Sequence, residues 1–251
     1  MNPQADVKPL PNPEPMDFEH LNIGALLDFR PDQGIIRLHE QRVVILSAAA
    51  MGLLKKELID TLGLETTRRL MLRFGYADGY HDAVSLRDRS KWTTPLEGLR
   101  AGAVLHRLEG IVGTEITKVE HDATSGRFEE EVFWHDSYAA EQHVHHYGKS
   151  DVPVCWSLAG YASGYVSACL GQEIYFRERE CLAQGAPKCS VVGKDAESWR
   201  DDLEALRLDF QSADLGQEVE RVREAVHKRL QELERRERHV AKRERELNLL
   251  R

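Results

Sequence analysis

Three of the four cysteines limit what this chain can fold into more than any other feature. Cys181 and Cys189 flank a short stretch that contains Gly185 and Pro187, a composition that favours a tight reversal between two strands. The paired stems of a hairpin lie about 5 Å apart, so these two thiols can meet. Cys155 lies upstream, where a segment rich in small residues begins. A metal held by all three thiolates would fix the hairpin against that segment.

Tetrahedral zinc needs a fourth ligand, which the spacing does not identify. Cys169 is excluded, because residues 154–170 predict a helix in which Cys155 and Cys169 would lie about 21 Å apart. Glu178 and Cys181 face opposite sides of a regular strand, so their pairing requires a bulge or a strand end. A second interpretation stays open, in which all four cysteines are small buried residues without a metal. The acids near the hairpin are Glu173, Glu178 and Glu180.

The composition excludes several classes of function. The chain has 251 residues, 41% of them hydrophobic, which suffices for one core with an appendage. A net charge of -8 argues against a nucleic-acid-binding surface. No apolar run approaches the roughly 20 residues that span a bilayer, and the N-terminus lacks the apolar region of a signal peptide. We therefore expect a cytoplasmic protein without a membrane partner, in which cysteines are metal ligands or buried groups rather than disulfides.

The N-terminal quarter divides into a lead and a small folded unit. Residues 1–17 contain five prolines and predict a disordered lead-in. Residues 18–60, interpreted as a dimerisation segment, combine a hairpin with a helix over 48–62. The hairpin is predicted from two β-rich runs on either side of a polar turn, Ile35–Ile36 and Val43–Leu46.

Residues 61–195 predict a mixed α/β domain of the α+β class. Its first helix is expected from Glu65 to about Leu86, and residues 92–99 are predicted as loop because they contain Pro95 and Gly98. Small residues in the helix over 154–170 permit close approach of a second backbone. The other expected elements are strands at 103–108, 114–120 and 128–135, a helix at 135–147, and a final hairpin over 173–192.

The chain changes character after about residue 196, where we expect a linker helix over 196–251. Residues 217–251 contain no Gly or Pro and are dense in Glu and Arg. Their apolar residues step by three, four or seven, with one stutter, which favours a dimeric coiled-coil-like helix over a solvated single helix. Glu237 and Glu244 fall on this seam and weaken it. The seam consists of Val219, Val222, Val226, Leu230, Leu233, Val240 and Leu247.

His106 and Trp134 are candidates for holding a small aromatic molecule. His106 is predicted on an apolar strand, and Trp134 lies near the end of the next but one. An imidazole and an indole N–H can bond the same hydroxyl oxygen, and both rings offer an aromatic face. Each residue taken alone is more often an ordinary core residue. Further aromatic surface is expected from Tyr161, Tyr165 and Phe176.

Two other features receive a structural interpretation. The cluster of His143, His145 and His146 is read as part of an exposed polar helix, because no acid or cysteine is placed to complete a metal site. Catalysis finds little support, since the chain has neither a phosphate-binding loop nor a nucleophile elbow. We therefore expect no enzyme, although a zinc- or Cys-dependent enzyme acting on small aromatics and a ligand-free coiled-coil adaptor remain alternatives.

Several motifs resemble the vinyl-4-reductase-type domain in the sensory half of aromatic-responsive, sigma-54-dependent transcription activators of the NtrC type. The resemblance covers roughly residues 20–245, and the phenol-responsive members are the most similar. Its motifs are Val152–Trp156, Gly160–Tyr165, Glu178–Cys181 and Gly185–Cys189, and upstream Phe29–Pro31 and Phe74–Tyr80.

The resemblance implies a ligand set and a binding pocket. It implies one structural zinc ion per chain, and a phenol pocket in which His106 and Trp134 hold the hydroxyl. Such a pocket favours phenols over toluene-like hydrocarbons, because a hydrocarbon leaves the buried polar pair unsatisfied at a cost of about 1–3 kcal/mol. The implied zinc ligands are Cys155, Glu178, Cys181 and Cys189.

The resemblance also implies a role in signalling. Members of the family continue into an ATPase domain and a DNA-binding domain, whereas this chain stops at Arg251, so neither activity is expected of it. We expect a homodimer in which ligand binding alters packing around the 154–170 helix. The linker over 196–251 would carry that change to the ATPase of the full-length activator.

Overall fold

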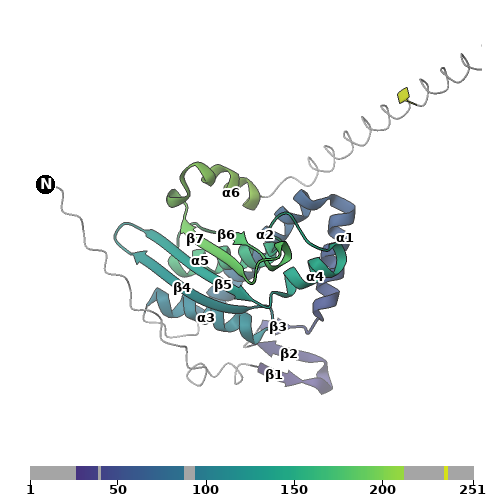
Figure 1. Cartoon of the computed structure of the whole chain (residues 1–251). Helices are drawn as coiled ribbons and strands as arrows, with labels where there is room; N and C mark the ends of the chain where they lie inside the picture. The colour runs from purple at the N-terminus through teal and green to yellow at the C-terminus, as the bar shows by residue number, and fades with distance from the viewer. Residues whose placement is uncertain (1–26, 39–40, 88–93, 212–234, 237–251) are drawn as a thin grey trace, which may run out of the picture. The chain divides into compact units, whose positions relative to one another are not determined.

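The computed structural model describes residues 27–38, 41–87, 94–211 and 235–236 (Figure 1). The chain divides into two units, Met1–Phe210 and Gln211–Arg251, and the description below concerns the first. The predicted lead-in at 1–17 and the residues of the heptad-like seam lie outside the described residues. Among the described residues, no helix is both long and apolar enough to cross a bilayer.

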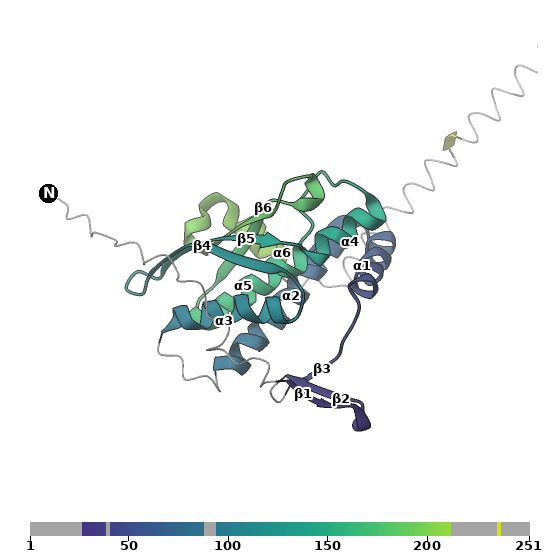
Figure 2. The same ribbon diagram turned by 60° about the horizontal axis from the view of Figure 1, so that its bottom comes forward.

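The core of the first unit is a four-stranded antiparallel sheet with helices on one face. Its strands are β4 (Gly113–Asp122), β5 (Arg127–His135), β6 (Ile174–Glu180) and β7 (Cys189–Asp195), in the order β4-β5-β7-β6. The helices on that face are α2 (Leu64–Arg87), α3 (Pro95–Leu108) and α5 (Trp156–Leu170), as Figure 2 shows. Along β5, the alternate side chains from Phe128 to Trp134 are buried, as expected for a strand with one covered face. The mixed α+β class is therefore confirmed.

Helices α2 and α5 approach each other so closely that only glycine fits between them. A Cβ atom at Gly164 of α5 would lie 1.9 Å from the carbonyl oxygen of Tyr76, and one at Gly75 of α2 would lie 2.0 Å from that of Ser157. Gly79 and Gly160 make equivalent contacts, with distances of 2.2 and 2.1 Å. The close approach predicted from the small residues of the 154–170 segment is confirmed.

A second, three-stranded sheet lies near the N-terminus. It consists of β1 (Leu27–Arg30), β2 (Ile35–Leu38) and β3 (Gln41–Val43), all antiparallel. The predicted hairpin is confirmed as β2–β3, but the sequence did not indicate β1, which a short 3-10 helix (Pro31–Gln33) connects to β2. The prediction of a strand through Leu46 is wrong, because pairing ends at Val43. Exposed residues 44–46 then lead to α1 (Ala48–Leu62).

The predictions of a loop at 92–99 and a strand at 103–108 are wrong from Pro95 onward, because these residues form α3. Pro95 and Gly98 suggested a loop, yet proline is favourable in the first turn of a helix, where its missing N–H needs no partner. The preceding Thr94 caps the helix by accepting a hydrogen bond from the N–H of Glu97. His106 therefore lies in the last turn of a helix.

The remaining elements match their predictions closely. The expected strands at 114–120 and 128–135 correspond to β4 and β5, and the final hairpin corresponds to β6 and β7. The polar helix predicted over 135–147 begins later, because the Ser137 side chain caps α4 (Tyr138–Tyr147). Two 3-10 helices, Leu182–Gln184 and Glu197–Asp202, and the helix α6 (Leu203–Phe210) complete the first unit.

We predict that Gly164→Ala lowers the free energy of unfolding by about 2–3 kcal/mol, because the new methyl group would overlap a backbone oxygen that cannot rotate away. Urea unfolding followed by circular dichroism measures this change. The matched control is Gly52→Ala in α1, where the new Cβ would meet the side chain of Gln142, which can move. Equal losses for both variants would contradict the importance of the backbone contact.

Candidate functional site

Cys155, Glu178, Cys181 and Cys189 form a compact buried cluster. Their candidate ligand atoms all lie within 4.8 Å of one another. The three Sγ–Sγ distances are 3.7, 3.8 and 3.8 Å. Thiolates bound to tetrahedral zinc at about 2.3 Å would stand about 3.8 Å apart, so the three sulfur atoms have the spacing of a tetrahedral metal site. Cys169 lies outside this group.

Glu178 completes the donor set because the regular strand pairing is interrupted. The register between β6 and β7 shifts between Glu178 and Glu180, which removes the alternation that would separate Glu178 from Cys181. Oε2 of Glu178 accepts a hydrogen bond of 3.0 Å from the backbone N–H of Cys155, whereas the buried Oε1 has no hydrogen-bond partner among the described residues. An unsatisfied carboxylate oxygen beside three thiols fits a metal ligand.

The surroundings of the cluster stabilise negative charge. The backbone N–H of Leu182 donates to Sγ of Cys189 over 3.4 Å, and Oγ of Ser137 lies 3.2 Å from Sγ of Cys155. Burial raises the pKa of Glu178 to about 8, and hydrogen bonds from the other two thiols lower the pKa of Cys181. A divalent cation would replace the protons that these crowded groups otherwise share.

Lys55 of α1 brings a buried positive charge to the same region. Its Nζ donates to the carbonyl oxygen of Val154 over 2.8 Å and lies 4.4 Å from the ring centre of Trp156. Burial lowers the pKa of this lysine to about 8, while the neighbouring thiols and Glu178 act in the opposite direction. Nothing in the sequence indicated this contact, because Lys55 and Val154 are 99 positions apart.

All five residues predicted to contact a ligand line one inner pocket, a cavity of about 50 Å³ between α3, α5 and the covered face of the sheet. His106 comes from α3, Trp134 from β5 and Phe176 from β6. Tyr161 and Tyr165 come from successive turns of α5. The other lining residues are mostly apolar, and they are Leu99, Gly102, Ala103, Thr114, Ile116, Glu130, Val132, Ala162 and Val166.

His106 and Trp134 are the polar aromatic groups of this pocket that remain without a protein partner. Their exposed fractions are 4% and 2%, and neither ring forms a hydrogen bond with a described residue. Burial lowers the pKa of His106 to about 4, so its imidazole is neutral at physiological pH and carries one donor and one acceptor nitrogen. The pocket thus holds groups able to bind a hydroxyl from both sides.

The two tyrosines and Phe176 contribute apolar faces to the inner pocket. The hydroxyl of Tyr161 donates to Asp82 over 2.9 Å, and that of Tyr165 donates to the carbonyl oxygen of Gly98 over 3.0 Å. Since both hydroxyls are bound within the protein, the rings rather than the oxygens face a ligand. The Tyr161 ring also lies 4.0 Å from that of His106, measured between ring centres.

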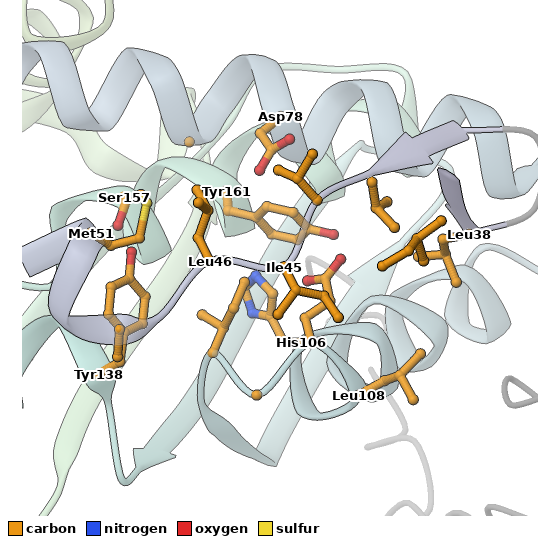
Figure 3. A pocket seen from close by; sticks show the side chains of 18 of the residues that line it. Leu38, Ile45, Leu46, Met51, Asp78, His106, Leu108, Tyr138, Ser157 and Tyr161 are labelled. Carbon is orange, nitrogen blue, oxygen red and sulfur yellow. The ribbon is translucent and has the colours of Figure 1, made fainter. Parts of the chain in front are cut away.

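A larger outer groove, of about 680 Å³, borders the inner pocket. It runs between the β1–β3 segment, α2 and the end of α3, and it includes Asp78 and Glu109 (Figure 3). His106 and Tyr161 line both cavities, so the groove meets the inner pocket at these two rings. The inner pocket contains all the predicted contact residues, whereas the groove contains only two of them.

The sequence reasoning missed two functional candidates in and beside the inner pocket. Glu130 lies in its lining with 3% of its surface exposed, and Asp82 of α2 holds the Tyr161 hydroxyl. The signal for Glu130 was present, because it occupies an inward position of β5 that alternation assigns to an apolar residue. The partner of Tyr161 could not be inferred, because Asp82 is 79 positions away.

The histidine cluster forms no metal site among the residues that the structure describes. There, the Cys/Glu cluster is the only group of three or more potential ligands. The ring of His143 packs against Trp156 with ring centres 6.4 Å apart, and that of His145 lies 4.8 Å from His146. These contacts agree with the structural interpretation of the cluster.

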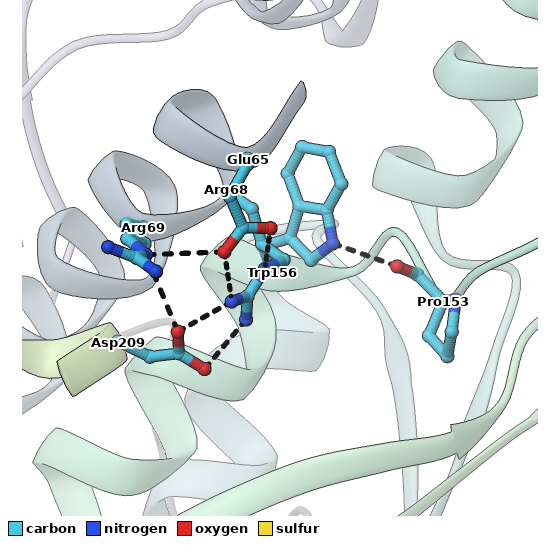
Figure 4. A network of polar contacts seen from close by, with 6 residues as sticks. All are labelled: Glu65, Arg68, Arg69, Pro153, Trp156 and Asp209. Atoms are coloured by element: carbon cyan, nitrogen blue, oxygen red, sulfur yellow. Dashed lines mark hydrogen bonds and ion pairs between the residues drawn. The ribbon is translucent and has the colours of Figure 1, made fainter. Parts of the chain in front are cut away.

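A polar network joins α6 to α2 (Figure 4). Arg68 donates to both carboxylate oxygens of Asp209, over 2.7 and 2.5 Å, and also binds Glu65. A bidentate arginine–carboxylate pair fixes orientation as well as distance. The last helix of the first unit is thus held against the helix that packs on α5.

Comparison with known proteins identifies the class of protein to which this fold and pocket belong. The family described as "Activator of aromatic catabolism" matches residues 22–122, and the vinyl-4-reductase-type domain matches residues 134–195. The chain belongs to the family of sensory domains of aromatic-responsive transcription activators. The two matched regions meet between β4 and β5, which are paired strands of one sheet.

Individual relatives agree with this assignment. The chain is 37% identical to the phenol-responsive sensory domain of the transcription activator PoxR, solved with phenol, at a TM-score of 0.73 over 77% of this chain and 96% of that one. It is 34% identical to the phenol regulator MopR of Acinetobacter guillouiae over 83% of this chain, and 34% identical to the transcriptional regulatory protein XylR of Pseudomonas putida over 72%. The chain covers only 37% and 32% of those two regulators.

We predict that stability falls as pH rises because of Glu130. Burial raises the pKa of its carboxyl to about 8, so between about pH 4.5 and 8 the folded state keeps a proton that the unfolded state has released. The stabilisation is therefore complete below the unfolded pKa and is lost as pH approaches 8. From pH 6 to 8.5, the wild type should lose about 2–3 kcal/mol relative to Glu130→Gln, measured by urea unfolding.

Glu129→Gln is the matched control. Glu129 faces the other side of β5, contacts Lys118 and Lys194, and has a lowered pKa, so it titrates below this window. Parallel stability profiles for the wild type and Glu130→Gln across pH 6–8.5 would show that Glu130 is not buried as a neutral acid.

Proposed function

We propose that this chain is a phenol-sensing regulatory domain that binds phenol or simple substituted phenols in the inner pocket. The observation that carries the proposal is the pair of His106 and Trp134, two buried polar rings without a protein partner in an otherwise largely apolar pocket. A phenol hydroxyl satisfies both, while its ring meets Tyr161, Tyr165 and Phe176. The similarity to the PoxR sensory domain with phenol and to the phenol regulator MopR supports this choice of ligand.

We propose further that Cys155, Glu178, Cys181 and Cys189 hold one zinc ion. Soft thiolate ligands with tetrahedral spacing favour zinc, and four protein ligands leave no open coordination position. The ion would supply structural cross-linking rather than chemistry. It would join the start of α5 to the β6–β7 hairpin, and so hold two walls of the inner pocket in place.

The proposed signal leaves the domain through its helices. Residues 18–60 would form a dimerisation segment, which the exposed apolar side chains of Phe29, Val44 and Ile45 support. Residues 61–195 would form the sensing domain and residues 196–251 a linker helix. In a full-length activator, this linker would transmit ligand binding to an ATPase domain. A ligand can do so only by binding the two conformations of the domain with different affinity.

An enzymatic role has less support than a binding role. A closed zinc site leaves no position for a substrate, and the relatives are regulators and a sensory domain. The cluster and the inner pocket together therefore favour reversible binding without turnover.

We predict that phenol binds the wild type and that His106→Ala weakens binding at least ten-fold, since the loss of a hydrogen bond to a buried hydroxyl costs about 1.5 kcal/mol or more. Titration calorimetry measures both affinities, and chromatography of the recovered ligand should show unchanged phenol. His145→Ala, on the exposed side of α4, is the control and should bind as the wild type. Equal affinity for phenol and toluene would overturn the role of His106 and Trp134, and consumption of phenol would favour an enzyme.

We predict that the purified chain contains one zinc ion and that Cys189→Ser loses it. Two remaining thiolates and a carboxylate bind zinc far more weakly, so metal analysis after dialysis should give near-zero zinc. The melting temperature should fall by at least about 10 °C, because metal-binding free energy contributes directly to folding. Cys169→Ser is the matched control and should keep both its zinc and its stability. A chain isolated without zinc would remove the metal from the proposal.

A further inference from the structure

Glu130 occupies a position in the inner pocket that local structure assigns to an apolar residue. On β5 it lies between Phe128 and Val132 in the row of buried, inward-facing side chains. Its direct neighbours across the sheet are Val119 and Gly193, neither of which offers a polar side chain. A carboxyl group in such a row is costly unless something compensates for its burial.

No described residue provides that compensation. The carboxyl group of Glu130 forms no hydrogen bond or ion pair with the described part of the chain, and burial alone accounts for its raised pKa. At neutral pH it is therefore an uncharged carboxylic acid, which offers one hydrogen-bond donor and an acceptor oxygen. The side chain lines the same cavity as His106 and Trp134. Its unused hydrogen-bonding capacity is therefore available to a bound molecule.

Glu130 and Trp134 lie at different ends of the inner pocket. They are four residues apart on one strand, so their Cα atoms stand about 13 Å apart, and the apolar Val132 lies between them. His106 and Trp134 therefore form one polar end and Glu130 a second, with aromatic and aliphatic surface in between. A single ring held at the first end directs its far side, and not its near side, toward Glu130.

We propose that Glu130 recognises a second hydroxyl group at the meta or para position of a phenol bound by His106 and Trp134. The ligand class is the dihydroxybenzenes whose two hydroxyls are separated around the ring, namely resorcinol and hydroquinone. The second hydroxyl donates to the carbonyl oxygen of the neutral acid or accepts its proton in a hydrogen bond. This inference rests on the proposed phenol pocket and adds a specificity-determining residue to it.

The arrangement distinguishes positional isomers. In catechol, the second hydroxyl is adjacent to the first and stays near His106 and Trp134, so it cannot reach the far end. Catechol and phenol are therefore insensitive to Glu130, whereas resorcinol and hydroquinone depend on it. This contrast separates a specific contact from a general effect of the substitution on the pocket.

The test is calorimetric titration of phenol, catechol, resorcinol and hydroquinone, in oxygen-free buffer, into the wild type, Glu130→Gln and Glu130→Leu. In Glu130→Leu, the affinities for resorcinol and hydroquinone should fall at least ten-fold relative to phenol. Affinities for phenol and catechol should stay constant or increase, since an unpaired polar group has been removed. Glu130→Gln keeps a donor and an acceptor, so its ratios should stay within about three-fold of the wild type.

Two outcomes overturn the inference, and they differ from failure of the proposed function. If phenol binds but the ratio of resorcinol and hydroquinone to phenol is the same in the wild type and in Glu130→Leu, Glu130 does not read a substituent and the phenol pocket stands. The same holds if the wild type binds both dihydroxybenzenes at least ten-fold more weakly than phenol. If the wild type does not bind phenol, the proposed function and this inference fall together. Glu130→Val, whose branched side chain suits a strand, replaces Glu130→Leu if the latter fails to fold.

Discussion

The close contact between α2 and α5 is the constraint on which the rest of the described domain depends. Four glycines remove the side chains that would hold the two backbones apart, so carbonyl oxygens of one helix lie where Cβ atoms of the other would stand. This contact fixes the rotation of α5 about its axis as well as its position. Since one face of α5 is committed to α2, the neighbouring face presents Tyr161 and Tyr165 to the inner pocket.

The metal-ligand cluster and the inner pocket are two ends of one packed unit. Cys155 precedes α5, whose later turns carry the two pocket tyrosines. Glu178 follows Phe176 on β6, and Cys189 of β7 pairs directly with Trp134 of β5. These three ligands are thus close to pocket residues, along the chain or across a strand pair. Any tie that fixes the cluster also restricts the rings that surround the cavity.

Much of this arrangement could be predicted from the sequence, and the exceptions have specific physical causes. Strand alternation, turn residues and caps determine β4 to β7 and α4 locally, and these were predicted well. The fourth member of the cluster could not be derived, because the register shift beside Glu178 depends on pairing with β7. The position of His106 was predicted on a strand, because Pro95 and Gly98 were taken as loop residues when Pro95 in fact opens a helix. Its role came from the resemblance, which does not depend on local conformation.

Long-range contacts escaped prediction for a related reason. The small residues of α5 indicated that some backbone would approach, but not that α2 would present matching glycines. Similarly, Tyr161 was expected to line a pocket, while its bond to Asp82 joins segments that no periodicity relates. Such contacts follow from how the helices stack, which is a property of the assembled core.

The bond between Tyr161 and Asp82 also bears on how a ligand in the inner pocket could be sensed outside it. The ring of Tyr161 packs on His106 in the pocket, its hydroxyl is held by α2, and the same residue borders the outer groove. A ring that binds His106 must share space with the Tyr161 ring, so it cannot enter without loading this contact. Because α2 also holds α6 through Arg68 and Asp209, a displacement of α2 reaches the last helix of the domain without passing through the sheet.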